Sequence, residues 1–105
     1  MAIPGIAIPT YNERENILTL LQAVHEQLPE ACALVIDDSS PDGTGDMVAD
    51  FMVDRPWVGL LRRPVKEGLG LAYFAGFAQL LERGCDPIIQ MDADFSHPPE
   101  KLVEL

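Results

Sequence analysis

The sequence is poor in positive charge and in long apolar runs, and each shortage excludes a class of protein. Seven Lys and Arg residues stand against seventeen Asp and Glu residues, giving a formal net charge of −10. Such a chain repels polyanions, so we expect no binding of nucleic acid, and a phosphate ligand needs an accompanying cation. No apolar run approaches the roughly 18 residues of a membrane-spanning helix, and the amino terminus has no signal-peptide pattern. We therefore expect a soluble, cytoplasmic chain.

Cysteine is also scarce, with Cys32 and Cys85 as the two examples. They are far apart in apolar segments and match no metal-binding spacing. The favoured interpretation is two buried thiols in a reducing compartment, with a disulfide as the alternative. Hydrophobic residues, by contrast, make up 48% of the 105 residues, which is enough for one packed folding unit. No linker or low-complexity stretch marks an internal domain boundary.

Short apolar runs alternate with amphipathic segments along the whole chain. The runs predict buried strands over residues 3–9, 33–37, 58–61 and 88–91, and the amphipathic segments predict helices over residues 13–28, 46–53, 69–83 and from 98 onward. Asn12 is the expected N-cap of the first helix, with Glu15 three residues later, and Gly84 is the expected stop of the third. The alternation predicts an open α/β fold, a mainly parallel sheet with helices on both faces.

Each predicted strand is followed by a polar segment. These segments cover residues 9–13, 37–44, 62–70 and 92–97. Ligands of open parallel sheets bind beyond the carboxyl ends of the strands, so we expect the four segments to converge on one site.

Asp92 and Asp94 form the most chemically suggestive of these segments. Two carboxylates at the end of a strand can supply oxygen ligands to Mg²⁺ or Mn²⁺, while a bound diphosphate supplies others. The alternative is a pair of solvated loop carboxylates. His97, beside two prolines, is either a further ligand or a packing or capping residue.

Asp37 and Asp38 are adjacent acidic residues at a strand end, and burying one without a partner would be costly. A donor group on a ligand would provide that partner, whereas capping of the following turn is an equally good explanation. After the third strand, Lys66 lies in a segment that also contains two arginines and a Gly-Leu-Gly sequence, which suggests a phosphate contact. Tyr11 can stack on a base or pack against its helix.

Four motifs occur in order along nearly the whole chain. They are Ile-Pro-Thr-Tyr-Asn-Glu at 8–13, Asp-Asp-Ser-Ser-Pro-Asp-Gly-Thr at 37–44, Lys-Glu-Gly-Leu-Gly at 66–70 and Met-Asp-Ala-Asp-Phe-Ser-His-Pro-Pro at 91–99. Together they resemble the successive signatures of family 2 glycosyltransferases. The second and fourth are most similar to those of polyprenyl-phosphate mannosyltransferases.

The resemblance implies a GT-A fold, with a Rossmann-like half that binds a nucleotide sugar, GDP-mannose above all. It places Pro9, Tyr11, Glu13 and Asp38 against the nucleoside, Lys66 near the donor, and Asp92 and Ala93 also at the nucleotide. Asp92, Asp94 and Ser96 would surround a Mg²⁺ or Mn²⁺ ion, with Asp92 and Asp94 as the catalytic residues. The implied reaction transfers mannose, with inversion, to a polyprenyl (dolichyl) phosphate at the cytoplasmic membrane surface.

The length departs from the family pattern, because the loops that hold the lipid phosphate follow the region where this chain stops. We therefore expect residues 1–105 to be the amino-terminal, nucleotide-sugar-binding part of a GT-A domain, inactive alone and inclined to self-associate. Donors such as UDP-glucose or UDP-N-acetylglucosamine remain alternatives. Two other classes of protein remain alternatives. One is a haloacid-dehalogenase-like phosphatase with Asp92 as nucleophile, and the other is a receiver-type module phosphorylated on an Asp.

Overall fold

The computed structural model describes residues 3–63, 76 and 78–91 of the chain. In chain order the elements are β1 (Ile3–Thr10), α1 (Ile17–Gln27), β2 (Cys32–Asp37), α2 (Thr44–Phe51), the 3₁₀ turn η1 (Met52–Asp54), β3 (Val58–Arg62) and β4 (Cys85–Gln90). The strands form one parallel sheet in the order β3-β2-β1-β4. Within the described residues, no helix has the length and apolarity needed to cross a membrane. The predicted α/β fold with a parallel sheet is confirmed.

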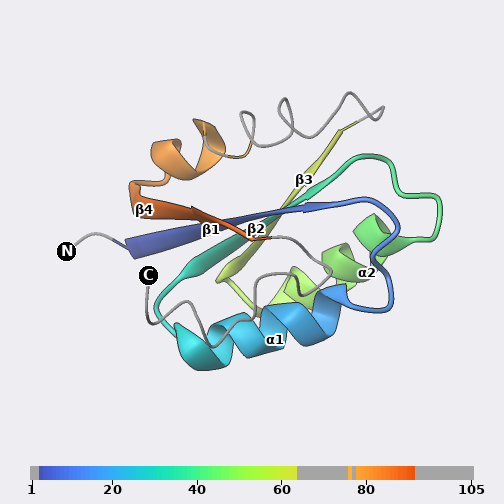
Figure 1. Cartoon of the computed structure of the whole chain (residues 1–105), viewed down its shortest axis with the longest axis horizontal. Coiled ribbons are helices and arrows are strands. Elements are labelled where there is room, and N and C mark those ends of the chain that lie inside the picture. The colour runs from blue at the N-terminus through green and yellow to red at the C-terminus, as the bar shows by residue number, and fades with distance from the viewer. Residues whose placement is uncertain (1–2, 64–75, 77, 92–105) are drawn as a thin grey trace.

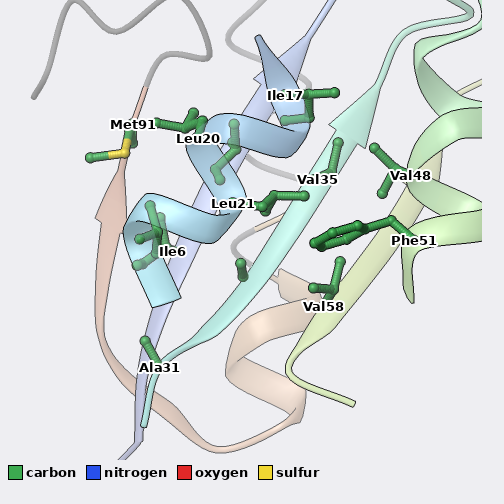
Figure 2. Close-up of a cluster of buried hydrophobic side chains, with 13 residues drawn as sticks. Ile6, Ile17, Leu20, Leu21, Ala31, Val35, Val48, Phe51, Val58 and Met91 are labelled. Carbon is green, nitrogen blue, oxygen red and sulfur yellow. The ribbon is translucent and has the colours of Figure 1, made fainter. Parts of the chain in front are cut away.

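Helices cover both faces of this sheet (Figure 1). Ile6 and Ile8 of β1 pack with α1 and α2 on one face, and Figure 2 shows Leu21 of α1 and Phe51 of α2 in that cluster. Ala7, between the two isoleucines, belongs to the opposite cluster, which contains Leu80 from the helical residues 78–82. Successive side chains of a strand point to opposite faces, so strands that are apolar throughout require cover on both.

Helix α1 begins at Ile17, four residues later than the capping pattern predicts, and the prediction of Asn12 as its N-cap is wrong. Asn12 has a left-handed backbone with φ of 57°, a conformation that asparagine tolerates better than most residues. Its side chain accepts a hydrogen bond from the Asp42 N–H at 3.4 Å. A contact with the loop after β2 therefore takes the place of the expected local cap.

Strand β4 begins at Cys85, three residues before the predicted start. The predicted helix stop is confirmed, because Gly84 has a φ of 79° between the helical residues and the strand. The pairing of β1 with β4 then shifts register, from Ile3↔Cys85 to Gly5↔Ile88. This bulge adds one residue on the β4 side and accommodates Pro87, which has no N–H to give to a ladder.

Strand β1 lies between two neighbours although it contains Pro4 and Pro9. The β2 ladder begins at Gly5, one residue after Pro4, and the described β4 ladder ends at Ala7. The Met91 N–H bonds the Ala7 carbonyl, so the backbone groups of residues 7 and 9 face β4. Each proline thus lies just outside the ladder that its missing N–H would have joined.

Candidate functional site

Three strands end on one line at the carboxyl edge of the sheet. Thr10 of β1 is paired with Asp37 of β2, which is paired in turn with Arg62 of β3. The segments that follow these residues therefore leave the sheet side by side. The predicted convergence is confirmed for the described residues of the polar segments after β1, β2 and β3.

Asp37 is a buried carboxylate that organises the turn after β2. It accepts hydrogen bonds from the Thr10 hydroxyl at 2.7 Å, the Ser40 hydroxyl at 2.6 Å and the Ser40 N–H at 3.2 Å. An alanine Cβ at Gly45 would lie 2.9 Å from Asp37 Oδ2, so the start of α2 packs closely on the carboxylate. These contacts give Asp37 the turn-capping role.

Asp38 has a different environment, although it is the next residue. Its N–H bonds the Thr10 carbonyl at 3.2 Å, which holds the chain against β1 beyond the end of β2. Its carboxylate lies 3.7 Å from Arg63 Nε, and the residue is 6% exposed. Arg63 is itself fixed, because its N–H donates to the Asp37 carbonyl. The two aspartates therefore have different roles. Asp37 caps the turn, whereas Asp38 lies beside the cationic side chain of Arg63.

The loops after β1 and β2 are joined by a set of hydrogen bonds that we call the loop bridge, between residues 12–14 and 40–44. The Asn12 N–H donates to Ser40 Oγ at 2.9 Å, and the Glu13 N–H donates to Thr44 Oγ1 at 3.1 Å. Arg14 donates twice to Asp42, from its N–H and from its guanidinium, both at 3.1 Å. The bridge fixes the segment that carries Tyr11 and Glu13 relative to the one that carries Asp38.

Asp42 is the acceptor at the centre of the loop bridge. Burial by itself would raise the pKa of Asp42, but hydrogen bonds from the Thr44 hydroxyl and from the N–H groups of Arg14 and Thr44, with the Arg14 charge, lower it on balance. The carboxylate form is therefore the one that holds the loops together. No local sequence pattern predicts this contact, because it joins residues 28 positions apart.

The other predicted nucleoside contacts that the structure describes lie at the end of β1 and in the loop that follows it. Pro9 is half-buried at the end of β1, opposite Ile36 of β2. Tyr11 is 40% exposed, so its ring is accessible to a base. Glu13 is half-buried, and its carboxylate accepts a hydrogen bond from Asn16 at 3.4 Å. This segment therefore offers an aromatic surface and a carboxylate, and the loop bridge joins it to the segment that follows Asp38.

Two hollows lie near the loop bridge. A hollow of about 140 Å³ lies at the ends of β2 and β3, lined by Asp37, Ser39, Ser40, Gly43, Gly45, Asp46, Arg62 and Arg63. In it, Arg62 forms an exposed ion pair with Asp46 at 2.9 Å. A larger groove of about 490 Å³ is lined by residues at the start of α1 and along α2, among them Leu18 and Phe51. The smaller hollow contains the cationic side chains expected for a phosphate contact.

The remaining predicted site residues lie outside the described part of the chain. They are Lys66, Asp92, Ala93, Asp94, Ser96 and His97. The predicted start of the third helix at residue 69 and the helix from residue 98 also lie outside it. Among the residues with described positions, no group of three or more His, Cys, Asp or Glu side chains could hold a metal ion. The metal-ligand assignments stay predictions.

This arrangement defines an open α/β domain whose candidate site lies at the carboxyl edge of a parallel sheet. The chain belongs to glycosyl transferase family 2, whose family model matches residues 5–105. It is 50% identical over 98 residues to the undecaprenyl-phosphate mannosyltransferase of Micrococcus luteus, covering 93% of this chain and 40% of that protein. It is 46% identical over 101 residues to the polyprenol monophosphomannose synthase of Mycolicibacterium smegmatis, covering 95% and 38%.

A solved structure supports the fold independently. The mannosyltransferase PcManGT from Pyrobaculum calidifontis, in complex with GDP-Man and Mn²⁺, matches with a TM-score of 0.73 at 23% identity, over 94% of this chain and 29% of that one. The expected GT-A type of fold is therefore confirmed. The chain spans at most 40% of the length of the two relatives named above. Family membership decides against the phosphatase and receiver alternatives.

Proposed function

We propose that the chain is the donor-binding part of a glycosyltransferase that transfers mannose from GDP-mannose to a polyprenyl phosphate. The observation that carries the proposal is the loop bridge, which joins the segment with exposed Tyr11 and half-buried Glu13 to the segment that follows Asp38 at the carboxyl edge. The names of the two relatives support the proposed reaction. One is an undecaprenyl-phosphate mannosyltransferase and the other a polyprenol monophosphomannose synthase.

In this proposal the described residues bind and orient the nucleoside. The Tyr11 ring stacks on the base, and the Glu13 and Asp38 carboxylates accept hydrogen bonds from base or ribose donors. The loop bridge holds these groups in place before the ligand arrives, which reduces the ordering cost of binding. Arg62 and Arg63 offset part of the repulsion between an acidic chain and a diphosphate.

In this proposal neither Asp37 nor Asp38 holds the divalent cation. Asp37 is occupied by hydrogen bonds from Thr10 and Ser40, and Asp38 lies beside Arg63, so neither is suited to ligate a metal. We therefore assign Mg²⁺ or Mn²⁺ to Asp92, Asp94 and Ser96, with Asp92 and Ala93 also at the nucleotide and Lys66 near the donor. Such an ion would neutralise the leaving diphosphate.

The acceptor phosphate is already an anion, so positioning can account for much of the catalysis without strong general-base activation. We place its binding residues after residue 105 and the reaction at the cytoplasmic membrane surface, where a polyprenyl phosphate resides. Contacts that hold both substrates would then come from the two parts of one GT-A domain.

The test is calorimetric titration of the full-length protein with GDP-mannose, UDP-glucose and UDP-N-acetylglucosamine, each with Mn²⁺ and with excess EDTA. We expect GDP-mannose to bind most tightly and only with the metal. A transfer assay with polyprenyl phosphate should then yield mannosyl lipid. Equal affinity in EDTA would contradict the metal assignment, and no product from any of the three donors would contradict the proposed function.

A further inference from the structure

Strands β2 and β4 each begin with a cysteine. Cys32 is the first residue of β2 and Cys85 the first of β4, and these strands flank β1 on opposite sides. Neighbouring strands are about 4.8 Å apart, so strands that flank a third are usually about 9.6 Å apart. A disulfide joins Cα atoms that are roughly 4.4–6.8 Å apart. In a regular sheet the two thiols would therefore be too distant to react.

Gly5 changes this geometry because it has no side chain. Gly5 of β1 is the direct partner of Cys32. An alanine Cβ at Gly5 would lie 2.8 Å from Cys85 Cβ and 3.3 Å from its Sγ. The register of β4 shifts opposite residues 3–5 of β1, and this shift allows the Cys85 side chain to lie so close to Gly5. The Cys85 side chain thus lies over Gly5, where it approaches the neighbouring Cys32.

The two thiols also share one apolar environment. Cys85 is buried in the hydrophobic cluster that contains Ala7 and Leu80, and Cys32 packs against the same cluster. Burial raises the pKa of Cys85, and the neighbouring Cys32 thiol raises it further. Cys85 is 3% exposed, whereas Cys32 is half-buried. Cys32 is therefore the less buried residue of the pair.

We propose that Cys32 and Cys85 form a dithiol that a hydroperoxide converts reversibly into an intramolecular disulfide. The thiolate of Cys32, the less buried residue, attacks one peroxide oxygen, the O–O bond breaks, and the alcohol or water product leaves with a proton, giving a sulfenic acid. The Cys85 sulfur then attacks the Cys32 sulfur, the S–O bond breaks, and water leaves with the Cys85 proton. Two thiols are oxidised by two electrons, and one hydroperoxide is reduced.

The disulfide would cross-link β2 to β4 over β1, at the edge of the sheet opposite the loop bridge. Oxidation should therefore raise resistance to unfolding while leaving nucleotide affinity within about twofold, since no candidate ligand contact lies at the amino ends of these strands. This inference does not rest on the proposed function, because it concerns only the geometry around Gly5.

The first test treats the folded protein with hydrogen peroxide, then denatures it and blocks free thiols with N-ethylmaleimide. We expect monomers in which Cys32 and Cys85 escape alkylation, a cross-linked peptide containing both residues, and full recovery of two alkylations after dithiothreitol. In Cys85→Ser, dimedone should label Cys32, whereas Cys32→Ser should give no label on Cys85 at the same exposure. Cross-linked dimers alone, or both thiols alkylated under conditions that oxidise Cys32 in Cys85→Ser, would overturn the proposal.

A second test probes the unmodified protein without oxidation. Phenylarsine oxide is retained where two thiols can bind one arsenic atom, so the native protein should hold one equivalent until a small dithiol removes it. Each single serine variant should lose this retention. Failure of the native protein to retain the arsenical would show that the thiols do not approach each other, whether or not the variants fold.

Discussion

The Thr10 hydroxyl donates a 2.7 Å hydrogen bond to the buried carboxylate of Asp37, which joins the last residue of β1 to the last residue of β2. Both residues are almost completely buried. Because an ionised carboxylate inside a protein needs donors, this contact supports the turn that leads to Asp38 and the loop bridge. A change at Thr10 should therefore affect both folding and ligand binding.

Thr10→Val keeps the shape of the side chain but removes the donor from Asp37. We expect the free energy of unfolding to fall by about 1–3 kcal/mol, because the buried carboxylate loses one donor and keeps those of Ser40. Urea unfolding followed by circular dichroism measures this. Thr10→Ser is the matched control, because it retains the hydroxyl. If valine destabilises no more than serine does, the hydrogen bond contributes nothing to stability.

Asp42 should make the loop bridge sensitive to acid. Its folded-state pKa is lowered from the ordinary value of 3.8, so the carboxylate stabilises the fold fully above that value and loses this effect as the pH falls through the lowered pKa. Asp42→Asn should therefore be less stable than the native protein at neutral pH, with the difference shrinking at pH values below 3.8.

Thermal unfolding of the two proteins across the acidic range checks this pH dependence. Asp54→Asn removes the same charge from the exposed turn η1, where the carboxylate makes only an exposed ion pair with its neighbour Arg55, and so serves as the control for net charge. A stability gap between native protein and Asp42→Asn that is constant with pH, after correction by this control, would contradict the assigned role of the carboxylate.

Gly76 marks a close approach between a helical residue and β2. A Cβ at this position would overlap Ile36 Cδ1 and lie 3.0 Å from Ile36 Cγ1. Gly76→Ala should therefore destabilise by about 1–3 kcal/mol through overpacking. Ile36→Val removes Cδ1, so the double variant should be more stable than the sum of the single effects predicts. Denaturant unfolding of the four proteins in the cycle measures this coupling, and strict additivity would argue against the contact.

Asp38→Asn tests the proposed nucleoside contact. If the carboxylate accepts a hydrogen bond from the base or ribose, nucleotide binding by the full-length protein should weaken by about 1.5–3 kcal/mol, the range for a charged partner. Asp54→Asn, whose carboxylate pairs with Arg55 on the exposed turn η1, is the control of equal charge. Calorimetric titration with GDP provides the affinities. Unchanged affinity in a folded Asp38→Asn protein would assign that side chain a structural role.

The sequence predicted the strands and the class of fold because their signals are local. Apolar runs bounded by polar segments correctly marked β1, β2 and β3, and Gly84 correctly marked the end of a helix. The start of α1 was wrong because Asn12 bonds Asp42, 30 residues away, instead of its own helix. The start of β4 was wrong because Pro87 argues against a strand, whereas a bulge at the β4 side of the sheet accepts it.

The site was predictable to the level of the edge on which it lies. Sequence alone could not separate the roles of Asp37 and Asp38, because their partners, Thr10 and Arg63, come from other strands or their ends. The loop bridge was missed for the same reason. Asp92, Asp94, Ser96 and Lys66 were chosen from motif resemblance, and their roles stay predictions.

The central position of β1 has a consequence for synthesis on the ribosome. Among the described strands β1 emerges first and can pair early with β2, but its other side stays unpaired until residues 85–90 form the last strand of the described sheet. An open strand edge in a nascent chain is a template for misassembly with other chains. Pro9 removes one N–H from the waiting side, and the Gly5 position offers no side chain to strengthen pairing there. Pro9 and Gly5, which fit β4 into the finished sheet, thereby also make the unpaired edge of β1 less prone to aggregate before β4 is synthesised.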